Sequence, residues 1–143
     1  MELKVAALLN SLFEKFDSRK LTTPEDIMSH NMSIWLRNRV LDEARLVFFH
    51  VPNEACIPHS YGKKLNAIGR ISGAPDFVVA SDNRVIFLEL KAGNNKMTEN
   101  QKAFEAWASY AGVPYFCTNS LSEAHSIVNE YVICSTPEKF SHK

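Results

Sequence analysis

Two helices are predicted at the start of the chain by the spacing of its apolar side chains. Between residues 2 and 16 these side chains recur every three or four positions, which is typical of an amphipathic helix. A second helix is predicted from residue 24 to about residue 41. Thr23 is suited to cap its first turn, Pro24 fits the first helical position, and acidic residues follow.

Strands are predicted in the middle of the chain by runs of Val, Ile and Phe. One covers residues 46–51, and two more, at 77–80 and 85–91, are joined by a short turn and form an antiparallel hairpin. Successive side chains of a strand point to opposite faces. In the strand 85–91 both sets are apolar until Glu89 and Lys91 at its end, which predicts a central strand covered on both faces.

The rest of the chain is predicted to form a long loop followed by alternating helices and strands. Residues 52–74 are rich in Pro and Gly, and a loop of this length is usually functional or mobile. A helix, a strand, a helix and a short strand are then predicted at 98–112, 114–118, 120–129 and 131–134. The order α-α-β-β-β-α-β-α-β predicts an α/β fold, a mixed β-sheet flanked by helices on both faces, in a single domain spanning residues 1–143.

Composition and charge narrow the class of protein. The 143 residues are 45% hydrophobic and 22% charged, as in ordinary globular domains. No apolar run is long enough to span a bilayer and no segment resembles a signal peptide, so a cytoplasmic protein without membrane contact is expected. A net charge of zero excludes a histone-like binder of nucleic acid. The three cysteines are unclustered and predict no disulfide framework.

Asp76 and Glu89 are the main candidate active-site residues. Asp76 begins one hairpin strand and Glu89 ends the other, so the hairpin places their side chains next to each other. Two adjacent carboxylates are stabilised by a shared cation, and oxygen ligands suit Mg²⁺ or Mn²⁺. Lys91 could contact a phosphate oxygen or lower the pKa of a metal-bound water. The alternative is that Asp76 caps a loop and Glu89 forms a structural ion pair with Lys91.

Other polar and aromatic residues allow a functional and a structural interpretation. Residues 59–72 contain three basic residues and no acidic one, which favours contact with a polyanion, although such charges also solubilise loops. His50, Cys56 and His59 lack the spacing and the fourth ligand of a zinc site and are interpreted as packing or surface residues. Three aromatic residues at helical spacing are interpreted as core rather than as base-stacking surfaces: Trp35, Trp107 and Tyr110.

Several motifs in this order resemble those of a nuclease family. Pro75-Asp76 followed by Glu89-Leu90-Lys91 resembles the PD-(D/E)XK nuclease superfamily. More specifically, four segments resemble the VRR-NUC family: FHVPNE at 49–54, GRISGAPDF at 69–77, FLELK at 87–91 and TENQ at 98–101. The resemblance covers residues 25–128 approximately and leaves the helix 2–16 outside it.

The resemblance implies a restriction-endonuclease-like fold and a metal-dependent phosphodiesterase that acts on DNA. It implies that Asp76, Glu89 and the backbone carbonyl of Leu90 bind Mg²⁺ or Mn²⁺. Lys91 would face the attacking water or the phosphate. Gln101 would belong to the same catalytic site.

Other assignments that follow from the resemblance have structural alternatives. Gln101 lies three positions after Thr98 and also fits a capping box. Glu25 matches an acid expected on the helix before the first strand, but a first-turn acid also favours the helix dipole. Glu54 is the second candidate for this acid. The candidate DNA-binding residues are Asn53, Lys63, Lys64 and Arg70.

The resemblance also implies a substrate class. Short single-domain members imply an endonuclease selective for branched DNA, such as four-way (Holliday) junctions of recombination and repair, acting as a homodimer. The helix 2–16 could supply the dimer interface or could simply pack on the core. The alternatives are a general nuclease or one directed to flaps or nicks, and, in another class, a non-catalytic DNA-binding or assembly subunit that keeps the nuclease fold.

Overall fold

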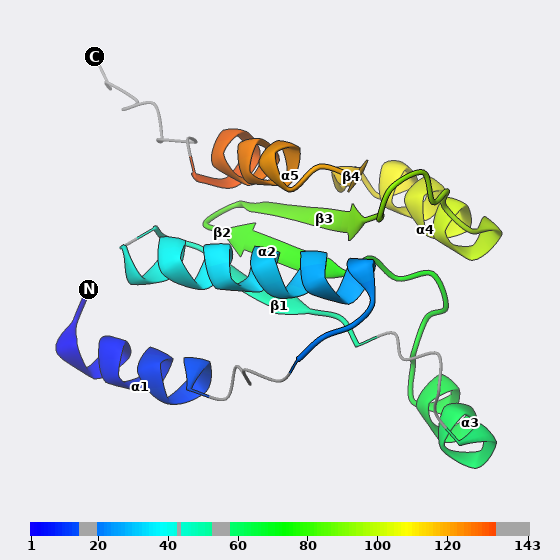
Figure 1. Ribbon diagram of the computed structural model, residues 1–143, viewed down its shortest axis with the longest axis horizontal. Coiled ribbons are helices and arrows are strands. Elements are labelled where there is room, and N and C mark those ends of the chain that lie inside the picture. The colour runs from blue at the N-terminus through cyan, green and yellow to red at the C-terminus, as the bar shows by residue number, and fades with distance from the viewer. Residues whose placement is uncertain (15–19, 43, 53–57, 134–143) are drawn as a thin grey trace.

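The computed structural model describes residues 1–14, 20–42, 44–52 and 58–133 (Figure 1). Its elements in chain order are α1 (Leu3–Phe13), α2 (Pro24–Leu41), β1 (Val47–His50), α3 (His59–Ala67), β2 (Phe77–Ser81), β3 (Arg84–Leu90), α4 (Glu99–Tyr110), β4 (Tyr115–Thr118), α5 (Leu121–Val128) and the π-helical turn η1 (Asn129–Ile133). Across these residues every helix is too short or too polar to span a bilayer.

The four strands form one mixed sheet in the order β1-β2-β3-β4. β1 pairs with β2 and β2 with β3 in antiparallel fashion, whereas β3 and β4 run parallel. The register places Phe77 opposite Leu88, so the start of β2 lies beside the end of β3. This sheet and its flanking helices confirm the predicted restriction-endonuclease-like α/β architecture.

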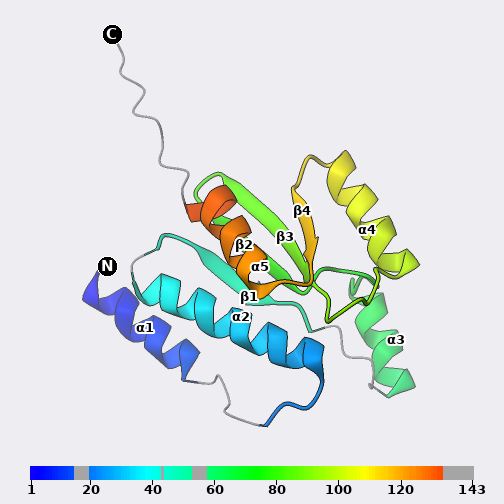
Figure 2. The ribbon, with the colours of Figure 1, turned by 45° about the horizontal axis from the view of Figure 1, so that its top comes forward.

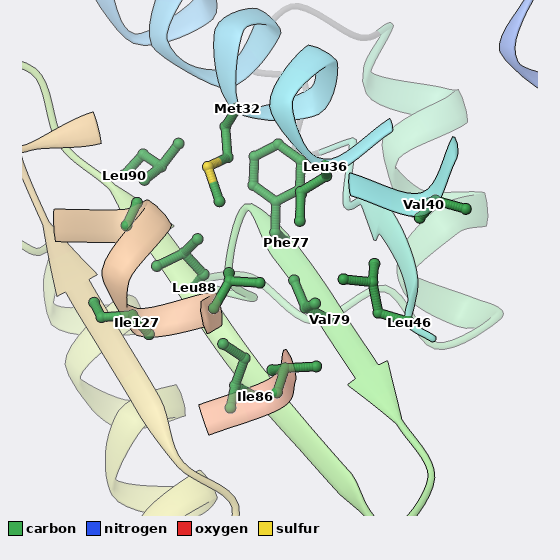
Figure 3. Close-up of a cluster of buried hydrophobic side chains, with 13 residues drawn as sticks. Met32, Leu36, Val40, Leu46, Phe77, Val79, Ile86, Leu88, Leu90 and Ile127 are labelled. Carbon is green, nitrogen blue, oxygen red and sulfur yellow. The ribbon is translucent and has the colours of Figure 1, made fainter. Parts of the chain in front are cut away.

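The hydrophobic core lies between one face of the sheet and the helices α2 and α5. Met32 and Leu36 of α2 and Ile127 of α5 point toward the inward side chains of β2 and β3, among them Phe77 and Leu88 (Figure 3). Burial of each such side chain stabilises the folded state by about 1.5–3 kcal/mol relative to leaving it exposed to water. The packing of α2 and α5 on the sheet therefore fixes the positions of the two strands that carry Asp76 and Glu89.

The opposite face of the sheet is covered less completely. Ile86, Leu88 and Leu90 of β3 are buried, whereas Val85 and Phe87 on the other face are half-buried. The ring of Phe104 from α4 packs edge-on against Phe87 with a centroid distance of 5.3 Å. The prediction that β3 is central is confirmed, but its second face is only partly covered.

Two elements differ from those predicted. Residues 52–74 are not one continuous loop, because α3 forms within them; its short length and Gly62 hide the helical pattern, since glycine weakens helices. The predicted strand 131–134 is also wrong, because residues 129–133 continue from α5 as a π-helical turn and residue 134 lies outside the described residues. Val132 has a strand-forming side chain, but burial in the core decides its conformation.

The interpretation of three aromatic residues as core is wrong for two of them. Trp35 packs against the core cluster, as expected. Trp107 is 56% exposed at the edge of a pocket, and Tyr110 is 91% exposed on the outer face of α4, which no element covers in the described part of the chain. The helical spacing of these residues is correct, but it does not say whether their face is covered.

Candidate active site

The carboxyl groups of Asp76 and Glu89 are held together by two hydrogen bonds. The backbone N–H of Asp76 donates to Oε2 of Glu89 at 3.2 Å. The backbone N–H of Leu90 donates to Oδ2 of Asp76 at 2.8 Å. Each strand end thus orients the acid of the other, which is the juxtaposition that the hairpin pattern predicts.

Burial makes the charged forms of both acids unfavourable. Desolvation is the largest cause of the raised pKa of Glu89, which lies at about 7, and the charge of Asp76 raises it further. The pKa of Asp76 is also raised, mainly by burial, although the hydrogen bond from Leu90 opposes this change. A cation beside both groups would favour their ionised forms.

Lys91 partly compensates this negative charge. Its Nζ lies 3.4 Å from Oε1 of Glu89, and both side chains are buried. Lys91 also lines a cavity of about 470 Å³ together with Lys96 and Asn119. The structural ion pair that the sequence allows therefore exists, and Lys91 is also part of the wall of this cavity.

Gln101 makes the predicted helix cap and also contacts one member of the acid pair, which consists of Asp76 and Glu89. Its Oε1 accepts from the backbone N–H of Thr98 at 2.9 Å, and its backbone N–H donates to Oγ1 of Thr98 at 3.2 Å. Its Nε2 donates to Oε1 of Glu89 at 2.7 Å. One amide thus couples the start of α4 to the position of Glu89.

Replacement of Gln101 by alanine is expected to lower stability by about 1 kcal/mol and to disturb Glu89 as well. Thr98→Ala is the matched control, because it weakens the same helix cap but keeps the amide on Glu89. Thermal unfolding should show similar losses for both variants. The DNA cleavage expected from the sequence motifs should fall more than about tenfold only for Gln101→Ala; equal activity of the two variants in that assay would assign Gln101 to the cap alone.

Glu25 reaches the same region from the first turn of α2. Its Oε1 accepts from Nδ2 of Asn95 at 3.1 Å and from the backbone N–H of Ala92 at 3.4 Å. Its negative charge contributes to the raised pKa of Asp76. Glu25 is thus near the acid pair and ties down the segment that follows Lys91. Glu54 and Asn53, the other predicted contributors, lie outside the described residues.

Two residues near the acid pair were not predicted to belong to it. His50 ends β1 opposite Phe77, packs its ring edge-on against Phe77 at 5.1 Å, and lowers the pKa of Asp76 through its charge. The antiparallel pairing of the first two strands would have placed it there. Asn95 belongs to no recognisable sequence motif, and only the fold brings its side chain within hydrogen-bonding distance of Glu25.

The predicted DNA-binding residues lie at the same end of the molecule as the C-terminal end of β3. Lys63 and Lys64 are exposed on α3, which stands away from the sheet at this end (Figures 1 and 2). Arg70 follows α3, and its Nε donates to Oδ1 of Asn66 at 2.9 Å. The positive charges therefore lie toward the same end of the molecule as Asp76 and Glu89.

The donor set suits a hard divalent cation that keeps part of its water shell. Among the described residues no three His, Cys, Asp or Glu side chains converge on one point that could hold a metal. Mg²⁺ commonly uses only one or two carboxylates, together with waters and substrate phosphates. Asp76 and Glu89 fit this pattern, since they are adjacent and their like charges disfavour joint ionisation without a cation.

Structural comparison identifies proteins with the same fold. No family model matches the sequence, and a search of curated proteins finds no match. One solved structure, described as a VRR_NUC domain protein, is 17% identical, with a TM-score of 0.58 over 79% of this chain and 91% of its own. Another, described as a VRR_NUC domain, is 18% identical, with a TM-score of 0.50 over 73% of this chain and 97% of its own. The chain therefore has the fold of VRR_NUC domains, as its motifs predicted.

Proposed function

We propose that this protein is a divalent-metal-dependent endonuclease that hydrolyses phosphodiester bonds in DNA. The observation that carries the proposal is the adjacent pair of carboxyl groups, buried Glu89 and half-buried Asp76, each of which accepts a backbone hydrogen bond from the other strand end and has a raised pKa. Burial of two adjacent acids is costly for folding and is typical of functional sites. The likeness to VRR_NUC domains supports the same reading at the level of the fold.

Asp76 and Glu89 would hold Mg²⁺ or Mn²⁺, with the backbone carbonyl of Leu90 as a further ligand. When bound, the ion would polarise the phosphate and lower the pKa of a bound water. The role of the protein is to fix both carboxyl groups before the substrate arrives. Leu90 N–H positions Asp76, and the amide of Gln101 positions Glu89.

Lys91 would place positive charge where negative charge develops on the phosphate. Its Nζ is held near Glu89, and Lys91 lines a cavity, so a phosphate bound there would need little reorganisation of this side chain. Glu25 would act through the backbone that follows Lys91, because it accepts hydrogen bonds from Ala92 and Asn95. Glu25 is thus proposed as a positioning residue.

The proposed substrate is branched DNA, recognised by shape rather than by sequence. Support comes from the basic side chains Lys63, Lys64 and Arg70. Such side chains bind phosphates, and contacts to phosphates do not distinguish one base sequence from another. The proposed homodimer stays a prediction. The outward side of α1 is consistent with it, because Leu3, Leu8 and Leu12 are more than half exposed, whereas Leu9 and Phe13 pack against the core.

Incubation with Mn²⁺ and a matched panel of DNAs tests this proposal. The panel contains fully paired duplex, nicked duplex, flap, single strand and four-way junction of related sequence. We expect cleavage that requires the metal and is fastest on the branched substrates. Cleavage of all DNAs at one rate would favour a general nuclease, and binding without cleavage would favour a non-catalytic DNA-binding subunit.

A further inference from the structure

An apolar pocket lies beside the proposed active site and is not used by it. It occupies about 610 Å³ between α3, the segment 69–74 and α4. The side chains that form most of its wall are Tyr61, Leu65, Arg70, Ile71, Phe104 and Trp107. Trp107 is 56% exposed and Tyr61 is 49% exposed, so two aromatic surfaces face solvent in one place. Exposed apolar patches of this kind commonly mark binding sites.

The pocket is already formed without a ligand. Gly73 adopts φ +85°, and a Cβ at this position would lie 2.3 Å from the backbone of Asn100, so the segment 69–74 sits directly on the first turn of α4. Asn100 Nδ2 also donates to Oγ of Ser72 at 2.9 Å. Phe104 holds the ring of Trp107 edge-on at 5.6 Å. The side of the pocket formed by the segment 69–74, Phe104 and Trp107 is therefore held in place, as is usual for ligand pockets.

The pocket adjoins the acid pair. Ala74 and Val51 both line it, and the backbone N–H of Val51 donates to the carbonyl of Asp76 at 2.7 Å. A nucleic acid strand with its scissile phosphate at Asp76 would thus have its neighbouring nucleotide next to the pocket. The pocket wall contains no acidic residue, and Arg70 lies in it. Charge and aromatic content both suit a nucleotide.

We propose that this pocket binds one unpaired nucleobase of the DNA, next to the phosphate that is cleaved. The base stacks on Trp107 and Tyr61, while Arg70 and the lysines of α3 contact the adjoining phosphates. A base within an intact duplex is stacked and paired and does not enter, so the pocket selects branched DNA in which a nucleotide at the branch point or flap is unpaired. This inference rests on the proposed nuclease function and names how its substrate is selected.

The test uses metal-free protein, so that the DNA is bound and not cut. The probes are a duplex with one unpaired 2-aminopurine and the same duplex with that base paired to thymine. We expect roughly tenfold tighter binding of the unpaired probe, with quenched fluorescence. Trp107→Ala should remove the preference and the quenching, whereas Trp107→Phe should keep most of both. Tyr110→Ala, on the outer face of the same helix, is the matched control and should behave like the wild type.

Each outcome separates the pocket from the nuclease proposal. Wild-type protein that binds neither probe overturns the proposed function and the pocket with it. Wild-type protein that binds both probes equally, or a folded Trp107→Ala variant that keeps the preference, overturns only the pocket. Sedimentation in parallel detects a further case: if Trp107→Ala turns a dimer into a monomer and leaves the preference unchanged, the pocket holds a second copy and not a base. Thermal unfolding of each variant identifies any loss that comes from misfolding.

Discussion

Replacement of Asp76 by asparagine is expected to lower metal-dependent DNA cleavage by roughly 10³-fold or more while the fold stays intact. Asparagine keeps a side-chain oxygen that can accept from Leu90 N–H, so the local hydrogen bond survives. It removes the negative charge that would bind the cation. It also removes the repulsion that raises the pKa of Glu89, so the metal-free variant should unfold at the same or a higher temperature than the wild type.

Asp82→Asn is the matched control for this variant. Asp82 lies in the turn at the opposite end of the same hairpin, is exposed, and has φ +24°. Asparagine tolerates positive φ, so this change should leave the fold undisturbed. The control should cleave DNA at the wild-type rate. Full activity in a folded Asp76→Asn protein would remove Asp76 from the chemistry.

The metal-free protein is expected to lose stability as pH rises toward neutrality, because of Glu89. The pKa of this carboxyl is about 7 in the folded protein and ordinarily 4.5. The folded state therefore binds more protons than the unfolded state between these values. The contribution of Glu89 to the free energy of unfolding is complete below pH 4.5 and is lost as pH passes through about 7, a change of about 3 kcal/mol. Asp76 acts in the same direction, since its pKa is also raised.

Comparison with Glu89→Gln isolates this effect from the titration of other groups. Denaturant unfolding in EDTA at several pH values gives the difference in stability between the two proteins. We expect the variant to become more stable relative to the wild type as pH rises from 4.5 to 7.5. Glu14→Gln, at the exposed end of α1, is the control and should follow the wild type. A constant difference for Glu89→Gln would show that Glu89 titrates at its ordinary pKa.

The central part of the fold was predictable because its signals are local. The hairpin 77–90 has two apolar runs around a short turn, and this alone places Asp76 beside Glu89. The helix that starts after Thr98 has a complete capping box, and the sequence pattern allows both contacts of Gln101, the cap and the hydrogen bond to Glu89. Local patterns of this kind fix backbone conformation regardless of the rest of the chain.

What could not be predicted depends on which surfaces meet. The spacing of Trp107 and Tyr110 predicts a helix correctly, but nothing in it reveals that Tyr110 lies on an open side of α4 and that Trp107 is only partly covered. Val132 has a strong strand preference, yet the hydrogen bond from Ser81 to its carbonyl and its burial hold it in a π-helical turn. Asn95 reaches Glu25 across 70 positions, a contact that only the packing of α2 on the sheet creates.

The proposed active site depends on one cation shared by Asp76 and Glu89, and binding of Mn²⁺ tests this most directly. Thermal unfolding at pH 7.5 is measured with increasing Mn²⁺ for the wild type, Asp76→Asn and Asp82→Asn. A ligand that binds only the folded state raises its stability in proportion to the logarithm of its concentration above the Kd. We predict a rise in Tm with the logarithm of the Mn²⁺ concentration for the wild type and Asp82→Asn and none for Asp76→Asn. An equal response of all three proteins, or no response of the wild type, would contradict the shared metal site.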